Sequence, residues 1–162
     1  MKGETIMSVF CPYKADMVLY LECQECEYKG CCKADDFFAL LVAGSRGIAN
    51  KEEIYNHLDK LLSKVKNRCK YIIIVEGGAD GVDTIAGEYA KEREYLLRVM
   101  PADWIKHGKS AGYIRNKAMH ELIANYKQRG CVLFWDGKSK GTAHSFELAK
   151  KYKNPIRAIR MK

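Results

Sequence analysis

Apolar and polar residues alternate along most of the chain in blocks that predict strands and helices in turn. The first apolar run, 37–43, is unbroken and ends at Gly44, which is typical of a strand buried on both faces of a parallel sheet. Asn50 and Glu53 then form a capping-box pattern ahead of apolar residues that recur with a helical period. We predict strands over 37–43, 71–75, 96–100, 131–135 and 156–159, and helices beginning after Asn50 and over 83–94, 109–126 and 142–152.

This alternation of strands and helices predicts an α/β fold. Successive parallel strands need helical crossovers, so we expect a Rossmann-like parallel sheet of about five strands with helices on both faces. The alternation begins near residue 36, and the sequence before it is short and rich in cysteine. We therefore predict two parts, a small Cys-rich arm over 1–35 and a Rossmann-like domain over 36–162.

The cysteines of the arm have the spacing of a metal site. Cys23 and Cys26 form a C-x2-C pair, Cys11 precedes them, and the adjacent Cys31 and Cys32 follow. Four thiolates suit tetrahedral zinc, and a segment this short gains folding energy from a metal. We predict a zinc-ribbon-like arm with a structural Zn²⁺ on Cys11, Cys23, Cys26 and Cys32, with Cys31 as the alternative fourth ligand; free thiols or a redox pair are the other interpretation.

Glycine-rich loops follow the predicted strands, and the carboxyl ends of parallel strands are where ligands bind in such folds. Glycine allows close approach of the backbone, and a helix that begins in such a loop offers free N–H groups to an anion. The spacing matches neither the phosphate loop nor the dinucleotide fingerprint. We predict ligand binding by Gly44, Ser45, Arg46, Gly77, Gly78, Ala79, Asp80, Asp83, Asp103, Trp104, Arg115, Asn116, Gly137, Ser139, Gly141 and Thr142.

Individual side chains in these loops suggest different roles. The forked guanidinium groups of Arg46 and Arg115 suit phosphate. Trp104 can stack on a base or cover the edge of the core. Asp80 and Asp83 can bind ribose hydroxyls, or they stabilise the turn and cap the helix that follows.

Five segments in chain order resemble one known family. They are 44–46, 77–83, 101–104, 111–119 and 141–142, and together they resemble the SLOG superfamily, within it the branch related to YspA and YpsA that is frequent in phages and bacteria. The resemblance implies a Rossmann-like fold and a pocket for a nucleoside phosphate or an ADP-ribose-like molecule. More distantly the chain resembles LOG and lysine-decarboxylase-like enzymes; LOG proteins commonly pair, which implies a homo-oligomer.

The LOG enzymes cleave nucleoside monophosphates into base and ribose phosphate, and they resemble this chain at Arg115 and at the Gly141–Thr142 turn. They carry a catalytic glutamate three residues after that threonine. Here Ser145 stands at that position, and Glu147 lies two residues further, on a different side of a helix. The resemblance therefore implies phosphate binding without that catalytic group.

Three functions are consistent with these features. The first is binding of a nucleotide or nucleotide-derived ligand for sensing or sequestration. The second is an N-glycosidic or phosphoribosyl hydrolase, with Glu76, Asp80 or Asp83 as base and Arg115 on the phosphate. The third is nucleic-acid binding through the zinc arm. Whether the protein is an enzyme is left open by the sequence.

Charge and hydropathy indicate only the general class of partner. The formal net charge of +8 favours anionic partners without choosing among them. No apolar run approaches the roughly 20 residues of a membrane helix, and the first ten residues lack the pattern of a signal peptide. We expect a cytoplasmic protein with no membrane partner.

Overall fold

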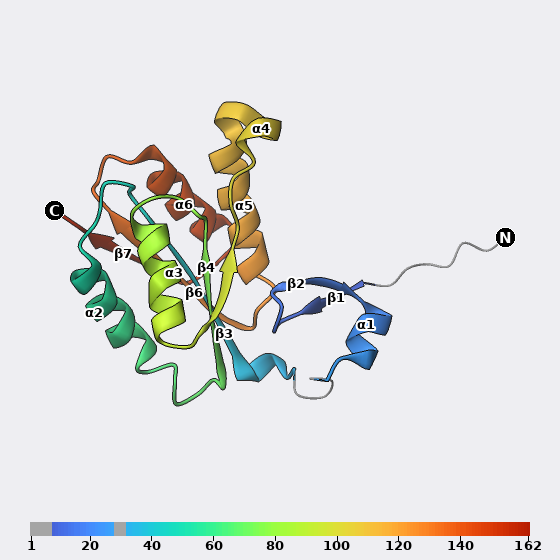
Figure 1. Cartoon of the computed structure of the whole chain (residues 1–162). Helices are drawn as coiled ribbons and strands as arrows, with labels where there is room; N and C mark the ends of the chain where they lie inside the picture. The colour runs from blue at the N-terminus through green and yellow to red at the C-terminus, as the bar shows by residue number, and fades with distance from the viewer. Residues whose placement is uncertain (1–7, 28–31) are drawn as a thin grey trace.

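A single parallel sheet of five strands forms the centre of the protein. The structure, a computed structural model, describes residues 8–27 and 32–162. The strand order is β5-β4-β3-β6-β7, and every neighbouring pair is parallel (Figure 1). This confirms the predicted α/β, Rossmann-like fold. The strands are β3 (Phe37–Gly44), β4 (Tyr71–Glu76), β5 (Leu96–Val99), β6 (Gln128–Trp135) and β7 (Ile156–Arg160).

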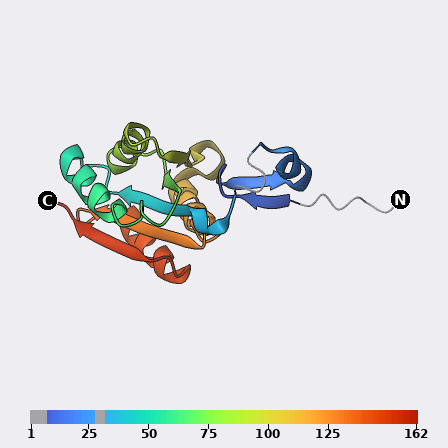
Figure 2. The same cartoon turned by 90° about the horizontal axis from the view of Figure 1, so that it is seen from below.

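Helices cover both faces of this sheet, as predicted. Helices α2 (Lys51–Leu62) and α3 (Val82–Glu92) pack on one face, and α5 (Ala111–Ile123) and α6 (Lys140–Lys151) pack on the other (Figures 1 and 2). Within residues 8–27 and 32–162, no helix has the length and apolar character needed to cross a membrane.

The central strand β3 joins the two cores. All residues from Phe37 to Ala43 are buried. Side chains alternate along a strand, so Leu40 packs in the core beneath α2 and α3, while Leu41 packs in the core beneath α5. The unbroken apolar run is therefore the pattern of a strand that is covered on both sides.

The start of α2 shows the N-cap half of the predicted capping box, while the Glu53 carboxylate bonds the Asn50 side chain in place of its backbone N–H. The side-chain oxygen of Asn50 accepts a hydrogen bond from the backbone amide of Glu53 at 3.1 Å, and the side-chain nitrogen Nδ2 of Asn50 donates to the Glu53 carboxylate at 3.1 Å. These contacts satisfy a backbone donor that the first turn of a helix leaves free.

The predicted helix over 109–126 is shorter and broken at its start. Residues Trp104–His107 form a short helix, α4, and a 3-10 turn over Gly108–Ser110 separates it from α5. Gly108 has a φ of +52°, which ends α4 and reorients the chain. Strand β6 begins at Gln128, three residues earlier than predicted, because Gln128 already pairs with Phe38.

The N-terminal arm packs against one end of the domain (Figure 2). It contains an antiparallel hairpin, β1 (Ser8–Cys11) and β2 (Asp16–Leu19), followed by α1 (Tyr20–Glu25). Phe10 and Ala15 pack with the core beneath α5, and the Tyr126 hydroxyl donates to the carbonyl of Pro12 at 2.7 Å. The arm and the sheet domain therefore share apolar contacts.

The zinc-ribbon character of this arm stays a prediction. Among the residues that the structure describes, no three His, Cys, Asp or Glu side chains are grouped so that they could hold a metal ion. The described cysteines include Cys11, Cys23, Cys26 and Cys32, whereas Cys31 lies outside the described residues.

Candidate functional site

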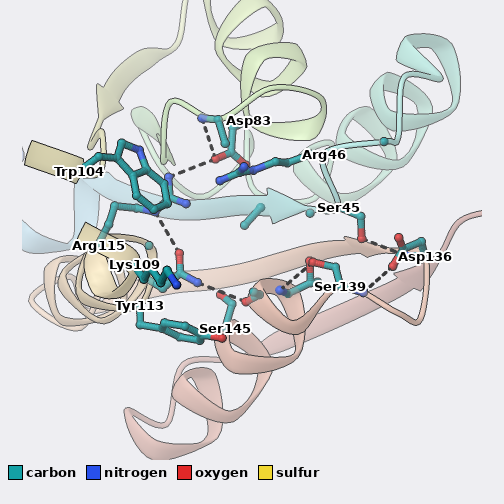
Figure 3. A pocket seen from close by; sticks show the side chains of 18 residues that line it. Ser45, Arg46, Asp83, Trp104, Lys109, Tyr113, Arg115, Asp136, Ser139 and Ser145 are labelled. Carbon is teal, nitrogen blue, oxygen red and sulfur yellow. Dashed lines mark hydrogen bonds and ion pairs between the residues drawn. The ribbon is translucent and has the colours of Figure 1, made fainter. Parts of the chain in front are cut away.

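A pocket with a volume of about 440 Å³ lies where the order of the strands reverses. From β3 the chain proceeds to β4 and β5 on one side and returns to β6 and β7 on the other. The residues that follow β3 and β6 form its walls, as expected for a ligand site at a topological switch point (Figure 3). Of the predicted residues, it is lined by Gly44, Ser45, Arg46, Ala79, Asp83, Trp104, Arg115, Asn116, Ser139, Gly141 and Thr142.

A second pocket, of about 360 Å³, adjoins the first. The two share Arg46, Ala79, Trp104 and Arg115 as lining residues, so these side chains stand between them. The second pocket is also lined by the predicted residues Gly77, Gly78 and Asp80, together with Pro101 and Ala102.

Three predicted residues lie outside the lining of both pockets. Asp103 caps α4, where its carboxylate accepts from the Lys106 amide at 2.9 Å. Gly137 adopts a φ of +80° in the turn after β6, next to the Arg160 side chain. Glu76 is only 4% exposed and lies under α3 near Gly87. None of the three is placed to touch a ligand in these pockets.

Several lining residues were not among those predicted. The N-terminal part of α5 and the turn before it contribute Lys109, Gly112 and Tyr113 to the first pocket. Gly112 and Tyr113 fall in the segment 111–119 that resembles the family, but no spacing marked the three side chains as pocket residues, because they come together only when α4 and α5 fold over the ends of the strands. The remaining unpredicted lining residues of this pocket are Ala43, Gly47, Asp136 and Ser145.

Arg115, on α5, and its neighbour Asn116 connect two of the loops that build the site. One guanidinium nitrogen, Nη1, donates to the carbonyl of Gly77 and lies 3.5 Å from the carboxylate of Asp83. Its Nε donates to the side chain of Asn116 at 3.0 Å, and Asn116 in turn donates to the carbonyl of Gly141 at 3.2 Å. Arg115 thus ties the loop after β4 to the start of α6.

Burial dominates the electrostatics of this cluster. It raises the pKa of Glu76 to about 7 and raises the pKa of Asp83 above its ordinary value, while it lowers the pKa of Arg115. The Arg115 charge partly offsets the rise at both carboxyl groups, and the Gly78 amide donates to Glu76. Ionising these buried carboxyl groups near pH 7 therefore destabilises the folded state, and the positive charge of Arg115 offsets part of that destabilisation.

Glu76→Gln is expected to reduce the loss of stability at alkaline pH. A carboxyl group whose pKa rises on folding contributes stability below its unfolded pKa, near 4.5, and loses that contribution as pH rises through about 7. The variant should therefore gain about 2 kcal/mol relative to wild type between pH 5 and pH 8. Urea unfolding at both pH values measures this, and a parallel pH dependence in the two proteins would contradict it.

Arg46 and Trp104 line both pockets. Both are exposed, Trp104 by 51%, and the guanidinium carbon of Arg46 lies 5.8 Å from the centre of a Trp104 ring. Figure 3 shows them with Asp83 on one side of the pocket, opposite Tyr113, Ser139 and Ser145. An accessible cation beside an accessible aromatic ring can bind an anionic group and a planar base together.

The loop between β6 and α6 is held by its own hydrogen bonds. The Asp136 carboxylate accepts from the amides of Lys138 and Ser139 at 2.8 and 2.9 Å, and these donors hold the pKa of Asp136 below its usual value. The Ser139 side chain caps α6 by accepting from the Thr142 amide, and Ser45 accepts from the Asp136 amide at 3.2 Å. The loop therefore presents the N-terminus of α6 to the pocket in a fixed orientation.

The position of the glutamate in the LOG enzymes is occupied by a buried hydroxyl. Ser145 lines the pocket and is 1% exposed. Glu147 is exposed and pairs with Lys150 at 3.1 Å, so it faces away from the pocket, as the helical spacing predicts.

Comparisons with known proteins relate the chain to one family. The model of the YspA, cpYpsA-related SLOG family matches residues 38–107. The Gene 61 protein of Mycobacterium phage D29 is 33% identical over 122 residues, covering 72% of this chain and 92% of that protein. A solved structure, the predicted subunit of tRNA methyltransferase from Methanocaldococcus jannaschii, is 15% identical, with 76% of this chain and 68% of that chain covered. Its TM-score of 0.34 is too low to bear on function.

Proposed function

The chain belongs to the YspA, cpYpsA-related SLOG family, and we propose that it binds a nucleotide or nucleotide-derived ligand, of the nucleoside phosphate or ADP-ribose type, for sensing or sequestration. The observation that carries this proposal is the composition of the pocket at the switch point. Arg46, Arg115 and the N-terminus of α6 all favour negative charge there.

The rest of the site suits the other parts of such a ligand. The pocket volume of about 440 Å³ is within the range of small-molecule sites. Trp104 offers an exposed ring for stacking of a base, and the adjoining pocket leaves room for a second group beyond the two arginines. A phosphate bound between Arg46 and Arg115 would therefore lie between the two pockets, and each pocket could hold an uncharged part of the ligand.

Binding is supported more strongly than hydrolysis. Glu76 lies outside both pockets, and the Asp83 carboxylate faces Arg115 at 3.5 Å. A hydrolase would need a carboxylate free to accept a proton from water beside the glycosidic bond. Asp80 is exposed and lines the second pocket but not the first.

Calorimetric titration with AMP and ADP-ribose tests the proposal. We expect saturable binding of at least one of them and much weaker binding of adenosine, which lacks the phosphate. Arg46→Leu should lower the affinity for AMP roughly tenfold, because it removes one charged hydrogen bond from an exposed position. Chromatography of the same mixtures for free adenine separates binding from cleavage. Equal affinity for AMP and adenosine, or release of adenine, would overturn the proposal.

The zinc prediction for the arm is tested by metal analysis. We expect about one zinc per chain in protein purified without added metal, and its loss in the double variant Cys23→Ser, Cys26→Ser. Cys69→Ala, a change in the core of the sheet domain, serves as the control and should keep its zinc. Wild-type protein without zinc would show that the cysteine spacing does not make a metal site.

A further inference from the structure

A buried histidine lies directly behind the pocket and has no part in the function proposed so far. His120, on α5, is fully buried, and its Nε2 lies 2.8 Å from the Oγ of Ser145, on α6. Its other ring nitrogen, Nδ1, lies 3.2 Å from the side-chain nitrogen of Asn154. In such a chain the histidine either accepts the serine proton, which activates the serine as a nucleophile, or donates to the serine oxygen, which leaves the hydroxyl to donate elsewhere. The position of the proton on the imidazole ring decides between the two.

The surroundings of Asn154 fix the orientation of its amide. Its Oδ1 accepts from the Nε of Arg129 at 2.7 Å, and a guanidinium group can only donate. Its Nδ2 lies 3.2 Å from the carbonyl oxygen of His120, which can only accept. Both contacts require the amide nitrogen to face the imidazole.

The tautomer of His120 follows from this orientation. Because Asn154 donates toward Nδ1, that nitrogen must be the acceptor, and the ring proton lies on Nε2. Burial also lowers the pKa of His120 to about 4, so the ring is neutral at pH 7. Nε2–H therefore donates to the Oγ of Ser145, which is the reverse of the bond that a general base makes to a nucleophilic serine.

The hydroxyl hydrogen of Ser145 is then available to donate to a group in the pocket. Within the part of the chain that the structure describes, the bond with His120 is the one hydrogen bond that the Ser145 hydroxyl makes. Helical side chains lean toward the N-terminus of their helix, so Ser145 leans toward Gly141 and Thr142 at the pocket wall.

We propose that Ser145 is a hydrogen-bond donor to an oxygen of the ligand, held in that role by His120 as a neutral imidazole protonated on Nε2, which Asn154 and Arg129 orient. The oxygen belongs to the phosphate or to the ribose of the nucleotide. This inference rests on the proposed function for its ligand, but the tautomer is a property of the protein alone. Ser145 is thereby assigned to recognition and not to nucleophilic attack.

Long-range ¹H–¹⁵N spectra of histidine-labelled protein test the tautomer without any ligand. At pH 7 we expect His120 to carry its proton on Nε2 and to stay neutral down to about pH 5. Asn154→Asp replaces the donor with an acceptor and should move the proton to Nδ1. A proton on Nδ1 in the wild-type protein would overturn the inference whatever the protein binds.

Titrations with AMP and adenosine test the contact with the ligand. Ser145→Ala should weaken AMP binding about tenfold, and Asn154→Asp should weaken it similarly, with circular dichroism confirming that both variants are folded. Ser110→Ala removes an exposed hydroxyl that bonds the carbonyl of His107 outside both pockets, and it should leave affinity unchanged. If Ser145→Ala weakens the binding of AMP alone, Ser145 donates to a phosphate oxygen. If it weakens the binding of both AMP and adenosine, Ser145 donates to a ribose oxygen. Wild-type affinity in folded Ser145→Ala would contradict the inference.

Discussion

Arg115→Leu is expected to destabilise the protein by about 4 kcal/mol at pH 8 and to abolish nucleotide binding. The Arg115 and Asp83 side chains are only 12% and 5% exposed, so the substitution leaves a buried carboxylate without its cation. Glu76, whose pKa also depends on the Arg115 charge, becomes harder to ionise as well. The cost is larger than that of losing a surface ion pair because water cannot take the place of the guanidinium group.

The pH dependence of this variant distinguishes the mechanism from simple loss of packing. With a pKa of about 7, Glu76 is protonated at pH 5, and without the Arg115 charge the pKa of Asp83 rises further, so Asp83 takes up a proton more easily at pH 5 than at pH 8 and the cost of losing Arg115 falls. Urea unfolding should therefore show a smaller destabilisation at pH 5 than at pH 8, and an equal loss at both would contradict the account. Arg46→Leu, an exposed arginine of the same pocket, is the matched control, with a change within about 0.5 kcal/mol.

Gly44→Ala is expected to lower the free energy of unfolding by about 3 kcal/mol. A Cβ at this position would lie 2.4 Å from the carbonyl oxygen of Phe134 and 2.5 Å from a methyl group of Val82. The first of these is backbone of the neighbouring strand β6, and the second begins α3, so neither can move without disturbing the sheet or the helix. The glycine is needed because two elements meet at the end of β3.

Gly47→Ala provides the comparison for this prediction. Gly47 lies in the same loop and lines the same pocket, but a Cβ there would meet nothing within 4 Å. Thermal and urea unfolding of the two variants should separate them by at least about 2 kcal/mol, with Gly47→Ala near wild type. Similar stabilities would show that the end of β3 can relax around an added methyl group.

The sequence was most informative where local chemistry and burial point to the same element. The unbroken run ending at Gly44 predicted β3, and Asn50 with Glu53 predicted the start of α2, because these signals act within a few residues. The short helix α4 over Trp104–His107 was not predicted, because four residues make little more than one helical turn and show no periodic pattern in the sequence.

The sequence by itself determined the fold class and most of the loop residues that line the pockets, because glycine-rich turns at the ends of parallel strands must meet at one edge of the sheet. Only the tertiary structure decided which side chains line the pockets. Glu76 turned under α3, whereas Tyr113 and Ser145 entered the pocket wall. The pairing of His120 with Ser145 joins residues 25 positions apart on two packed helices, and such contacts depend on helix packing that no local pattern encodes.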